Sequence, residues 1–133
     1  MIFVDSNIPM YVAGRDHPLK DPARRFLARV QSGRVEACTS TEVLQEILYR
    51  YVGLKRRDLA LQVYDLFVQL CAQVFAVTIA DTDRARSLVA EREEIGVRDA
   101  IHAAVMLNNG ISDIASFDAG FDEIEGIVRI DLR

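Results

Sequence analysis

The stretch that decides the fold is residues 97–122, which read VRDAIHAAVMLNNGISDIASFDAGFD. Its first part, from Asp99 to Leu107, is apolar nearly all round, so we expect a helix enclosed within the molecule rather than one on its surface. Asn109 and Gly110 predict a turn. Residues 114–117 then predict a short buried strand that ends on Asp118. A helix and a strand that each carry an acid at one end indicate an α/β fold. In such a fold, these acids can gather at one edge of the sheet and form a functional site.

Each of these acids also has an ordinary structural explanation. Asp99 at a helix start is stabilised by the helix dipole, by up to about 1 kcal/mol, and Asp118 is a preferred cap for the turn that follows. The N-terminal residues 1–7 favour a functional interpretation, because they read as an apolar strand that ends abruptly on Asp5. Open α/β sheets bind their ligands at the carboxyl ends of parallel strands. Three carboxylates at that edge would repel one another unless a positive charge lay between them.

Strand and helix patterns alternate along the whole chain, which predicts a three-layer α/β/α sandwich with a parallel-rich central sheet. Further strands are expected at 35–39, 74–78 and 127–130, and further helices at 8–13, 23–31, 39–51, 58–71 and 80–91. We find no internal repeat and no low-complexity tract. We therefore expect one domain that covers residues 1–133.

Composition narrows the class of protein. The chain has 133 residues, half of them hydrophobic, which is enough for a substantial core. Residues 1–4 lead directly to Asp5 without a basic start, and no apolar run approaches the length of a membrane span, so we expect neither a signal peptide nor a membrane protein. Cys38 and Cys71 lie in no metal-binding or redox spacing. They are expected to be free buried thiols in a reducing cytoplasm.

The charge distribution gives one further feature. A net charge of −4 would by itself argue against a nucleic-acid partner, but carboxylates gathered around a metal ion account for part of that charge. One concentrated basic cluster could contact RNA phosphates or an acidic partner, or could simply be a solvated turn. It consists of Arg50, Lys55, Arg56 and Arg57.

Two acids of the helix at 39–51 are expected to differ in role. Residues 39–42 fit a capping box, in which the Glu42 side chain returns to the backbone at the helix start. On the helical wheel, Glu46 lies at the edge of the apolar arc, whereas Glu42 points away from it. We therefore expect Glu42 to cap the helix and Glu46 to face a cleft. The alternative for Glu46 is a surface ion pair with Arg50, four residues on.

Four acids can thus be placed on one edge of the fold: Asp5, Glu46, Asp99 and Asp118. Carboxylate oxygens suit hard divalent ions such as Mg²⁺ or Mn²⁺, and such ions support phosphodiester hydrolysis. No Ser-His-Asp or Cys-His arrangement and no phosphate-binding glycine loop competes with this interpretation. We expect His102 to be a hydrogen-bonded core histidine rather than a base or a zinc ligand.

Four short motifs resemble those of the PIN domain. Residues 3–7 (FVDSN) resemble its opening Asp-Thr-Asn motif, 44–47 (LQEI) its internal Glu motif, 98–102 (RDAIH) its third motif and 116–118 (SFD) its closing Thr-x-Asp. The match covers essentially the whole chain, and in size and motif order it is most similar to the VapC toxins. The resemblance implies a ribonuclease that uses Mg²⁺ or Mn²⁺ to lower the pKa of the attacking water. It also implies a homodimer that is inhibited by a VapB-type antitoxin.

The resemblance also implies roles for individual residues. The metal ligands would be Asp5, Glu46, Asp99 and Asp118, with Asn7 and Ser116 as supporting polar groups. The serines at 6 and 116 replace threonines and keep the hydroxyl. Gly120 stands where many relatives carry a further acid, which would weaken a second metal position. Asp122 either substitutes in part or, as we expect, is an exposed acid of a turn.

Other functions remain open. The chain could be a PIN-fold module that only binds RNA or a protein, with the acids structural, although the intact quartet favours a nuclease. It could also be a PIN nuclease of RNA processing rather than a toxin. A third possibility is an acid-phosphatase-like fold with Asp5 as nucleophile, but Asn7 stands where a second acid would be needed.

Overall fold

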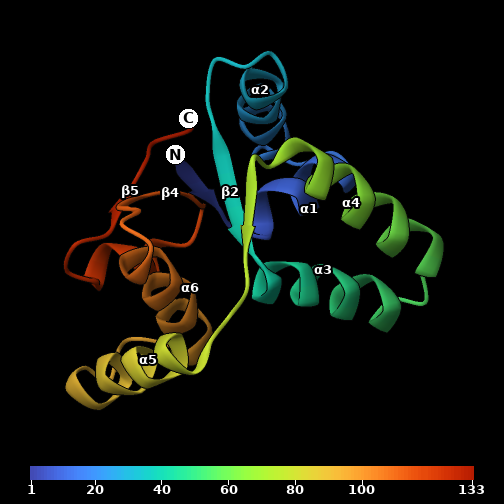
Figure 1. Cartoon of the computed structure of the whole chain (residues 1–133). Helices are drawn as coiled ribbons and strands as arrows, with labels where there is room; N and C mark the ends of the chain where they lie inside the picture. The colour runs from blue at the N-terminus through green and yellow to red at the C-terminus, as the bar shows by residue number, and fades with distance from the viewer.

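The computed structural model describes all 133 residues and contains a five-stranded sheet in the order β3-β2-β1-β4-β5 (Figure 1). All four strand pairs are parallel. The strands are β1 (Ile2–Val4), β2 (Ala37–Ser40), β3 (Gln73–Phe75), β4 (Asp113–Ala115) and β5 (Val128–Arg129). The first strand in the sequence therefore lies at the centre, between β2 and β4.

Helices cover both faces of this sheet. They are α1 (Asn7–Ala13), α2 (Lys20–Gln31), α3 (Thr41–Gly53), α4 (Arg57–Leu70), α5 (Ile79–Glu91) and α6 (Val97–Asn108), followed by the short 3₁₀ helix η1 (Ala119–Glu123). Right-handed crossovers put the first four helices on one face and the last two on the other. Figure 1 shows α3 and α4 to one side of the strands and α5 and α6 to the other. The α/β/α sandwich predicted from the sequence is confirmed.

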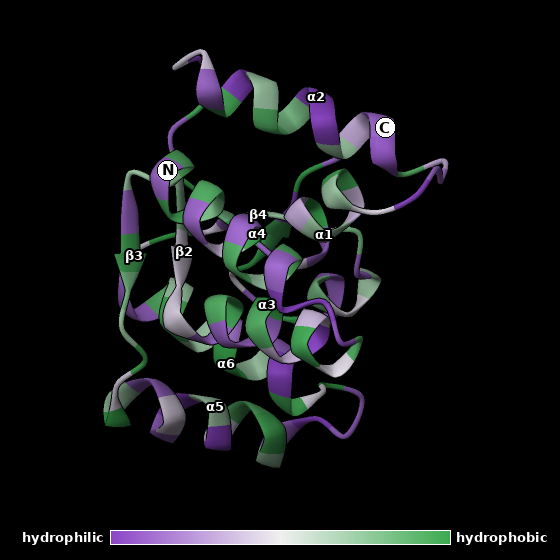
Figure 2. Cartoon of the chain, turned by 90° about the vertical axis from the view of Figure 1, so that its right-hand side faces the viewer, coloured by the Kyte–Doolittle hydropathy of each residue, from purple (hydrophilic) through white to green (hydrophobic).

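The helix α6 is enclosed, as its sequence predicts. Ala100, Ala103 and Ala104 have no exposed surface, and the residues that follow them up to Met106 are equally buried. Small side chains let this helix approach the sheet closely, which anchors Asp99 in its first turn. By contrast, α2 and α5 alternate between hydrophilic and hydrophobic residues along their length (Figure 2), as expected of helices with one face in solvent.

The predicted capping box at residues 39–42 is wrong. Thr39 lies within β2, and its hydroxyl donates to the Val4 carbonyl at 3.1 Å, so it is not available to cap a helix. Ser40 takes that role instead and accepts from the Val43 backbone N–H at 3.4 Å. The helix α3 thus begins at Thr41, and Glu42 lies in its first turn without a capping role.

The two cysteines are free, as predicted, but only Cys38 is fully buried. Cys71 is half-buried and follows α4 rather than lying within it. Burial raises the pKa of both thiols, that of Cys38 to about 11 and that of Cys71 to about 12. None of the helices combines the length and the apolar character that crossing a membrane requires.

Candidate functional site

The first acid of the site, Asp5, follows β1 directly and is 5% exposed. Its backbone N–H donates to the Ala115 carbonyl at 3.0 Å, which ties it to the end of β4. One carboxylate oxygen, Oδ1, accepts from the Ser6 backbone N–H at 2.7 Å, and the other, Oδ2, accepts from the Ser116 hydroxyl at 2.7 Å. Burial raises the pKa of Asp5, although these hydrogen bonds oppose the shift.

The second acid, Glu46, reaches Asp5 from α3 and is 8% exposed. Its Oε2 accepts from the Ser6 hydroxyl at 2.6 Å, and its Oε1 accepts from His102 Nε2 at 2.7 Å. The Arg98 guanidinium lies 3.9 Å from the same Oε1. Glu46 therefore faces the interior of the site, as the helical wheel predicts, and does not pair with Arg50.

His102 lies between these two carboxylates. It is 1% exposed, and its Nε2 is 3.7 Å from Asp5 Oδ1 as well as 2.7 Å from Glu46 Oε1. Burial by itself would lower the pKa of His102, but the hydrogen bond to Glu46 and the surrounding negative charges raise it. Burial by itself would raise the pKa of Glu46, but His102, Ser6 and Arg98 lower it. The pair is thus stabilised with the carboxylate negative and the imidazole positive.

The other two acids, Asp99 and Asp118, lie nearer to solvent. Asp99 is half-buried in the first turn of α6, and Asp118 is exposed after β4. A methyl group placed on Gly120 would come within 2.6 Å of Asp99 Oδ2 and 3.1 Å of Asp118 Oδ1, so both carboxylates meet at the Gly120 backbone. Burial and the charges of Asp118 and Asp5 raise the pKa of Asp99 to about 6. Asp118 also caps η1, because its Oδ1 accepts from the Gly120 N–H at 2.8 Å.

Asn7 and Ser116 link the buried pair of acids, Asp5 and Glu46, to the more exposed pair, Asp99 and Asp118. The Ser116 hydroxyl donates to Asp5 and accepts from the Asp118 backbone N–H at 3.0 Å. Asn7 Nδ2 donates to that hydroxyl at 3.2 Å and to Asp5 Oδ2 at 3.4 Å. These contacts fix the direction of the Asp5 carboxylate relative to the backbone that carries Asp118.

The structure therefore brings the four predicted acids and both supporting residues together. It adds Ser6, His102 and Gly120, which the sequence presents as a replaced threonine, a core histidine and a missing acid. The one available signal was the spacing of His102, three residues after Asp99 and so on the same helix face. Asp122 is not part of the site, because it forms a two-pronged ion pair with Arg129, at 2.8 and 3.0 Å.

The basic cluster lies apart from these acids. Arg50, Lys55, Arg56 and Arg57 are exposed where α3 gives way to α4. Figure 1 shows this junction at the outer end of the two helices, away from the strands. Arg56 is engaged with Asp58 at 3.2 Å, and the other three cations form no ion pair.

The donor set fits a hard divalent cation. Asp5 and Glu46 each offer a carboxylate oxygen, and these oxygens lie within 4.8 Å of each other and of a ring nitrogen of His102. A positively charged imidazole has no free lone pair, so His102 orients Glu46 rather than binding the ion. Asp99 and Asp118 add two more carboxylates, neither of which forms an ion pair with a basic side chain. Burial raises the pKa of Asp99, and the charges of Asp118 and Asp5 raise it further. A cation would relieve this repulsion between carboxylates.

Comparison with known protein families gives a match over almost the whole chain. The family model for the PIN domain matches residues 2–127. Ribonuclease VapC13 of Mycobacterium tuberculosis is 42% identical over 130 residues, which span 98% of this chain and 99% of that protein. Ribonuclease VapC23 of the same organism is 38% identical over 118 residues, which span 89% and 93% of the two chains.

Solved structures show the same fold. The M. tuberculosis toxin VapC20, which cleaves the sarcin–ricin loop, superposes with a TM-score of 0.70 and 22% identity, covering 89% of this chain and 90% of that one. VapBC2 of Rickettsia felis, bound to a DNA fragment from its promoter, gives a TM-score of 0.73 and 18% identity over 98% of both chains. At these sequence identities the comparison shows a shared fold only.

Proposed function

Because the chain belongs to the PIN-domain family and, within it, to the VapC ribonucleases, we propose that its acidic site hydrolyses RNA with the help of a divalent cation. The metal ligands in this proposal are Asp5, Glu46, Asp99 and Asp118. The observation that carries it is the convergence of four carboxylates from distant segments on the carboxyl edge of β1 and β4, which is where parallel α/β sheets bind ligands.

Mg²⁺ or Mn²⁺ would supply the positive charge that lowers the pKa of an attacking water and offsets charge on the phosphate. The protein's own residues prepare the site for that ion. Ser116 and the Ser6 backbone hold the Asp5 carboxylate in one orientation, and His102 and the Ser6 hydroxyl do the same for Glu46. Arg98 is 72% exposed beside Glu46 and is suited to contact a substrate phosphate.

The partners follow from the same family membership. We propose a VapB-type antitoxin as the inhibitor, as in the VapBC complex of R. felis, and a homodimer as the assembly. Large exposed apolar side chains support self-association, namely Tyr49, Ile79 and Val97, which are 78%, 76% and 64% exposed. The free thiols support an action on RNA in the reducing cytoplasm. Sedimentation of the purified chain tests the dimer, and a monomer at all concentrations would exclude it.

The exposed cluster of Arg50, Lys55, Arg56 and Arg57 is proposed as a contact for RNA phosphates or for an acidic segment of the antitoxin. Replacing Lys55 and Arg57 by Ala separates these roles. An RNA contact predicts a salt dependence of binding that flattens by about 0.7 log unit per lost contact. An antitoxin contact predicts weaker inhibition with unchanged RNA binding, and no change in either would exclude both.

The main test compares wild type with Asp99→Asn, which keeps the shape of the side chain but removes a ligand charge. We expect wild type to arrest bacterial growth on induction and to cut total RNA into discrete fragments that EDTA abolishes. Asp99→Asn should do neither, and Asp122→Asn, which removes an exposed acid outside the site, should behave as wild type. Cleavage that persists in EDTA or in Asp99→Asn would refute the metal mechanism. RNA cleavage without growth arrest would favour an RNA-processing nuclease.

A further inference from the structure

Three aromatic rings form a row from the acidic site to the loop between α1 and α2. Phe117 lies between Ser116 and Asp118 in the sequence, and its ring meets Tyr11 edge-on with centroids 5.4 Å apart. Tyr11 in turn packs against His17, with centroids 4.8 Å apart and the rings tilted by 39°. The backbone N–H of Phe117 donates to Asn7 Oδ1 at 3.5 Å, so the row is joined to the site itself.

The outer ring of this row is fixed in place but open to solvent. His17 is exposed, whereas Tyr11 and Phe117 are half-buried. Its Nδ1 accepts from the Leu19 backbone N–H at 3.0 Å, and one side of its ring packs on Tyr11. An aromatic ring that is already held in one orientation loses little conformational entropy when a ligand stacks on it.

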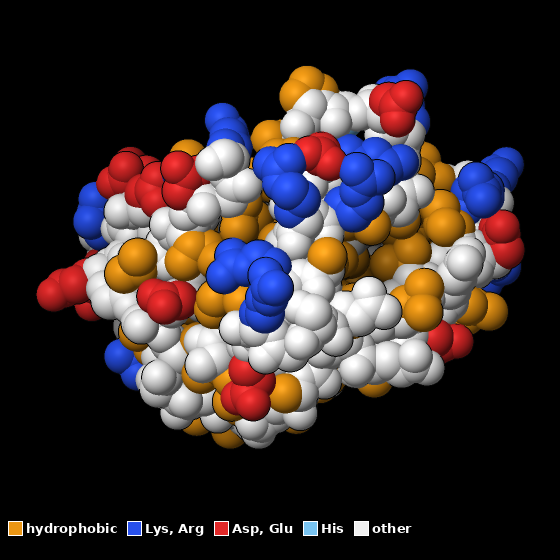
Figure 3. All heavy atoms as spheres, turned by 90° about the horizontal axis from the view of Figure 1, so that it is seen from above, with side chains coloured by type: hydrophobic (Ala, Val, Ile, Leu, Met, Phe, Trp, Pro, Cys, Tyr) orange, Lys and Arg blue, Asp and Glu red, His pale blue; other side chains and the backbone are white.

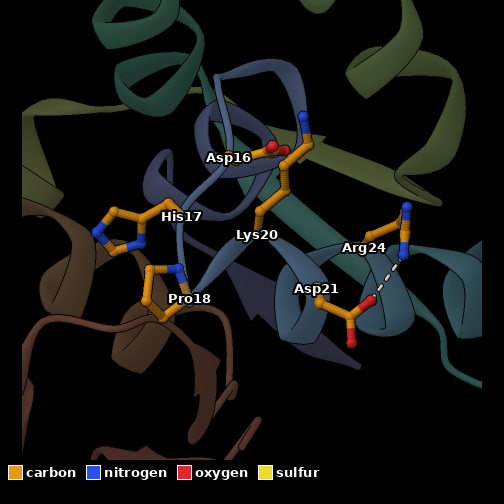
Figure 4. A pocket seen from close by; sticks show the side chains of 6 residues that line it. All are labelled: Asp16, His17, Pro18, Lys20, Asp21 and Arg24. Carbon is orange, nitrogen blue, oxygen red and sulfur yellow. Dashed lines mark hydrogen bonds and ion pairs between the residues drawn. The ribbon is translucent and has the colours of Figure 1, made fainter.

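Positive charge lies close to this ring. His17 borders an open hollow of about 550 Å³ that is lined by two cations, Lys20 and Arg24, and by two acids, Asp16 and Asp21. Arg24 pairs with Asp21 at 2.7 Å, and Lys20 Nζ donates to the Gly14 carbonyl at 2.6 Å. The helix α2 as a whole remains net positive, because it carries four cations and one acid. Figure 4 shows His17 and Arg24 on opposite sides of this hollow, with Lys20 between them. Figure 3 views the molecule from the side that carries α2 and shows Lys and Arg side chains gathered there. An aromatic surface beside cations is the combination that binds single-stranded nucleic acid.

We propose that the aromatic row binds an unpaired base of the substrate RNA, which stacks on the exposed face of His17 while the excess cations of α2 lie beside the neighbouring phosphates. This inference rests on the proposed ribonuclease function and assigns residues that hold a base of the substrate. Bases within a duplex are already stacked on their neighbours, so the row selects RNA loops or single strands. An RNA base is favoured over a protein side chain because the row starts within the acidic site, at Phe117.

The test uses two variants of His17 that separate the ring from its hydrogen bond. His17→Gln removes the aromatic ring and keeps a polar acceptor, whereas His17→Phe keeps a ring and removes the acceptor. The probe is a short single-stranded RNA that contains 2-aminopurine and that wild type cleaves in Mg²⁺. We expect KM to rise about tenfold in His17→Gln, with kcat within about twofold of wild type, because one base–aromatic stack is lost. His17→Phe should retain the wild-type KM.

A second readout is independent of cleavage. Binding without metal should quench the 2-aminopurine fluorescence in wild type and His17→Phe but not in His17→Gln, and the same RNA in a duplex should bind weakly to all three. An unchanged KM and quench in His17→Gln, or equal binding of the duplex, would overturn the inference. Unchanged RNA binding with weaker antitoxin inhibition would make the row a partner surface instead. A wild type that cuts no RNA would refute the proposed function, while the quench would still decide the stacking inference.

Discussion

The two halves of the acidic site are organised in different ways. Asp5 and Glu46 are buried, and each of their carboxylates is fixed by a serine hydroxyl, with His102 between them. Asp99 and Asp118 lie nearer to solvent, meet at the Gly120 backbone and form no ion pair. The protein's own hydrogen bonds thus fix the carboxylates of the buried half, whereas a bound cation is needed to balance the charge of the exposed half. In such a site the carboxylates are preorganised, and only the exposed pair is left without a cationic partner.

The largest loss of activity is expected from a substitution in the buried half of the site. Glu46→Gln keeps the side-chain size but removes the charge that faces His102, and it should lower kcat/KM by about 10³-fold or more, since transition-state charge stabilisation by a metal is worth several kcal/mol. Glu42→Gln is the matched control, because Glu42 lies in the first turn of the same helix without a site contact. It should retain nearly all activity. If Glu42→Gln were the more damaging change, the assignment of Glu46 as a ligand would be wrong.

An intermediate loss of activity is expected when Gly120 is substituted, because Asp99 and Asp118 meet at its backbone. Gly120→Ala would place a methyl group 2.6 Å from Asp99 Oδ2, so that carboxylate must move. Misplacement of a catalytic group by about 1 Å costs up to roughly 10²-fold, so we expect a loss of about 10- to 100-fold and a higher Mg²⁺ requirement. Gly53→Ala is the control, because nothing lies within 4 Å of a methyl group there. Equal activity of the two variants would show that the contact with Gly120 does not matter.

The smallest effect is on stability without metal. Asp99 has its pKa raised from 3.8 to about 6, so the protonated acid is favoured by folding. Its contribution to stability is therefore fully present below about pH 4 and is lost as the pH rises through about 6. In EDTA, Asp99→Asn should be more stable than wild type near pH 7.5, by about 1 kcal/mol after solvent screening, and equal to it near pH 4.

Thermal unfolding across this pH range measures the difference as a shift of several degrees. Asp122→Asn is the control of opposite sign, because Arg129 lowers the pKa of Asp122 and its ionised form therefore stabilises the fold. Added Mg²⁺ should remove the advantage of Asp99→Asn by stabilising wild type. A wild type that remains the more stable protein at pH 7.5 in EDTA would mean that the acids do not repel one another strongly.

Sequence patterns were sufficient to predict a parallel sheet and to place the four acids at one edge of it, since the carboxyl ends of parallel strands share one edge. They were not sufficient for the contacts that hold those acids. Ser6 follows a strand and precedes a helix, which is also the pattern of a helix cap, but its hydroxyl donates to Glu46 instead. His102 is the buried, hydrogen-bonded residue that was predicted, yet its partner lies 56 positions away. Such pairings depend on how separate helices pack, which local patterns do not encode.

Gly120 is a second position at which the sequence alone does not reveal a contact of the site. In the sequence it reads as a lost acid, because its immediate neighbours carry no information about what its Cα faces. In the structure it is the position at which two carboxylates approach the backbone, and a side chain there would collide with one of them. A missing functional group and a steric requirement look identical in a single sequence.

The central place of β1 in the sheet has a consequence for synthesis. Asp5 leaves the ribosome 111 positions before the serine that holds its carboxylate. At about 5–20 residues per second, the nascent chain spends on the order of ten seconds without a complete set of acids. A ribosome that translates this message is therefore not exposed to a finished nuclease on its own nascent chain until Ser116 and Asp118 have emerged.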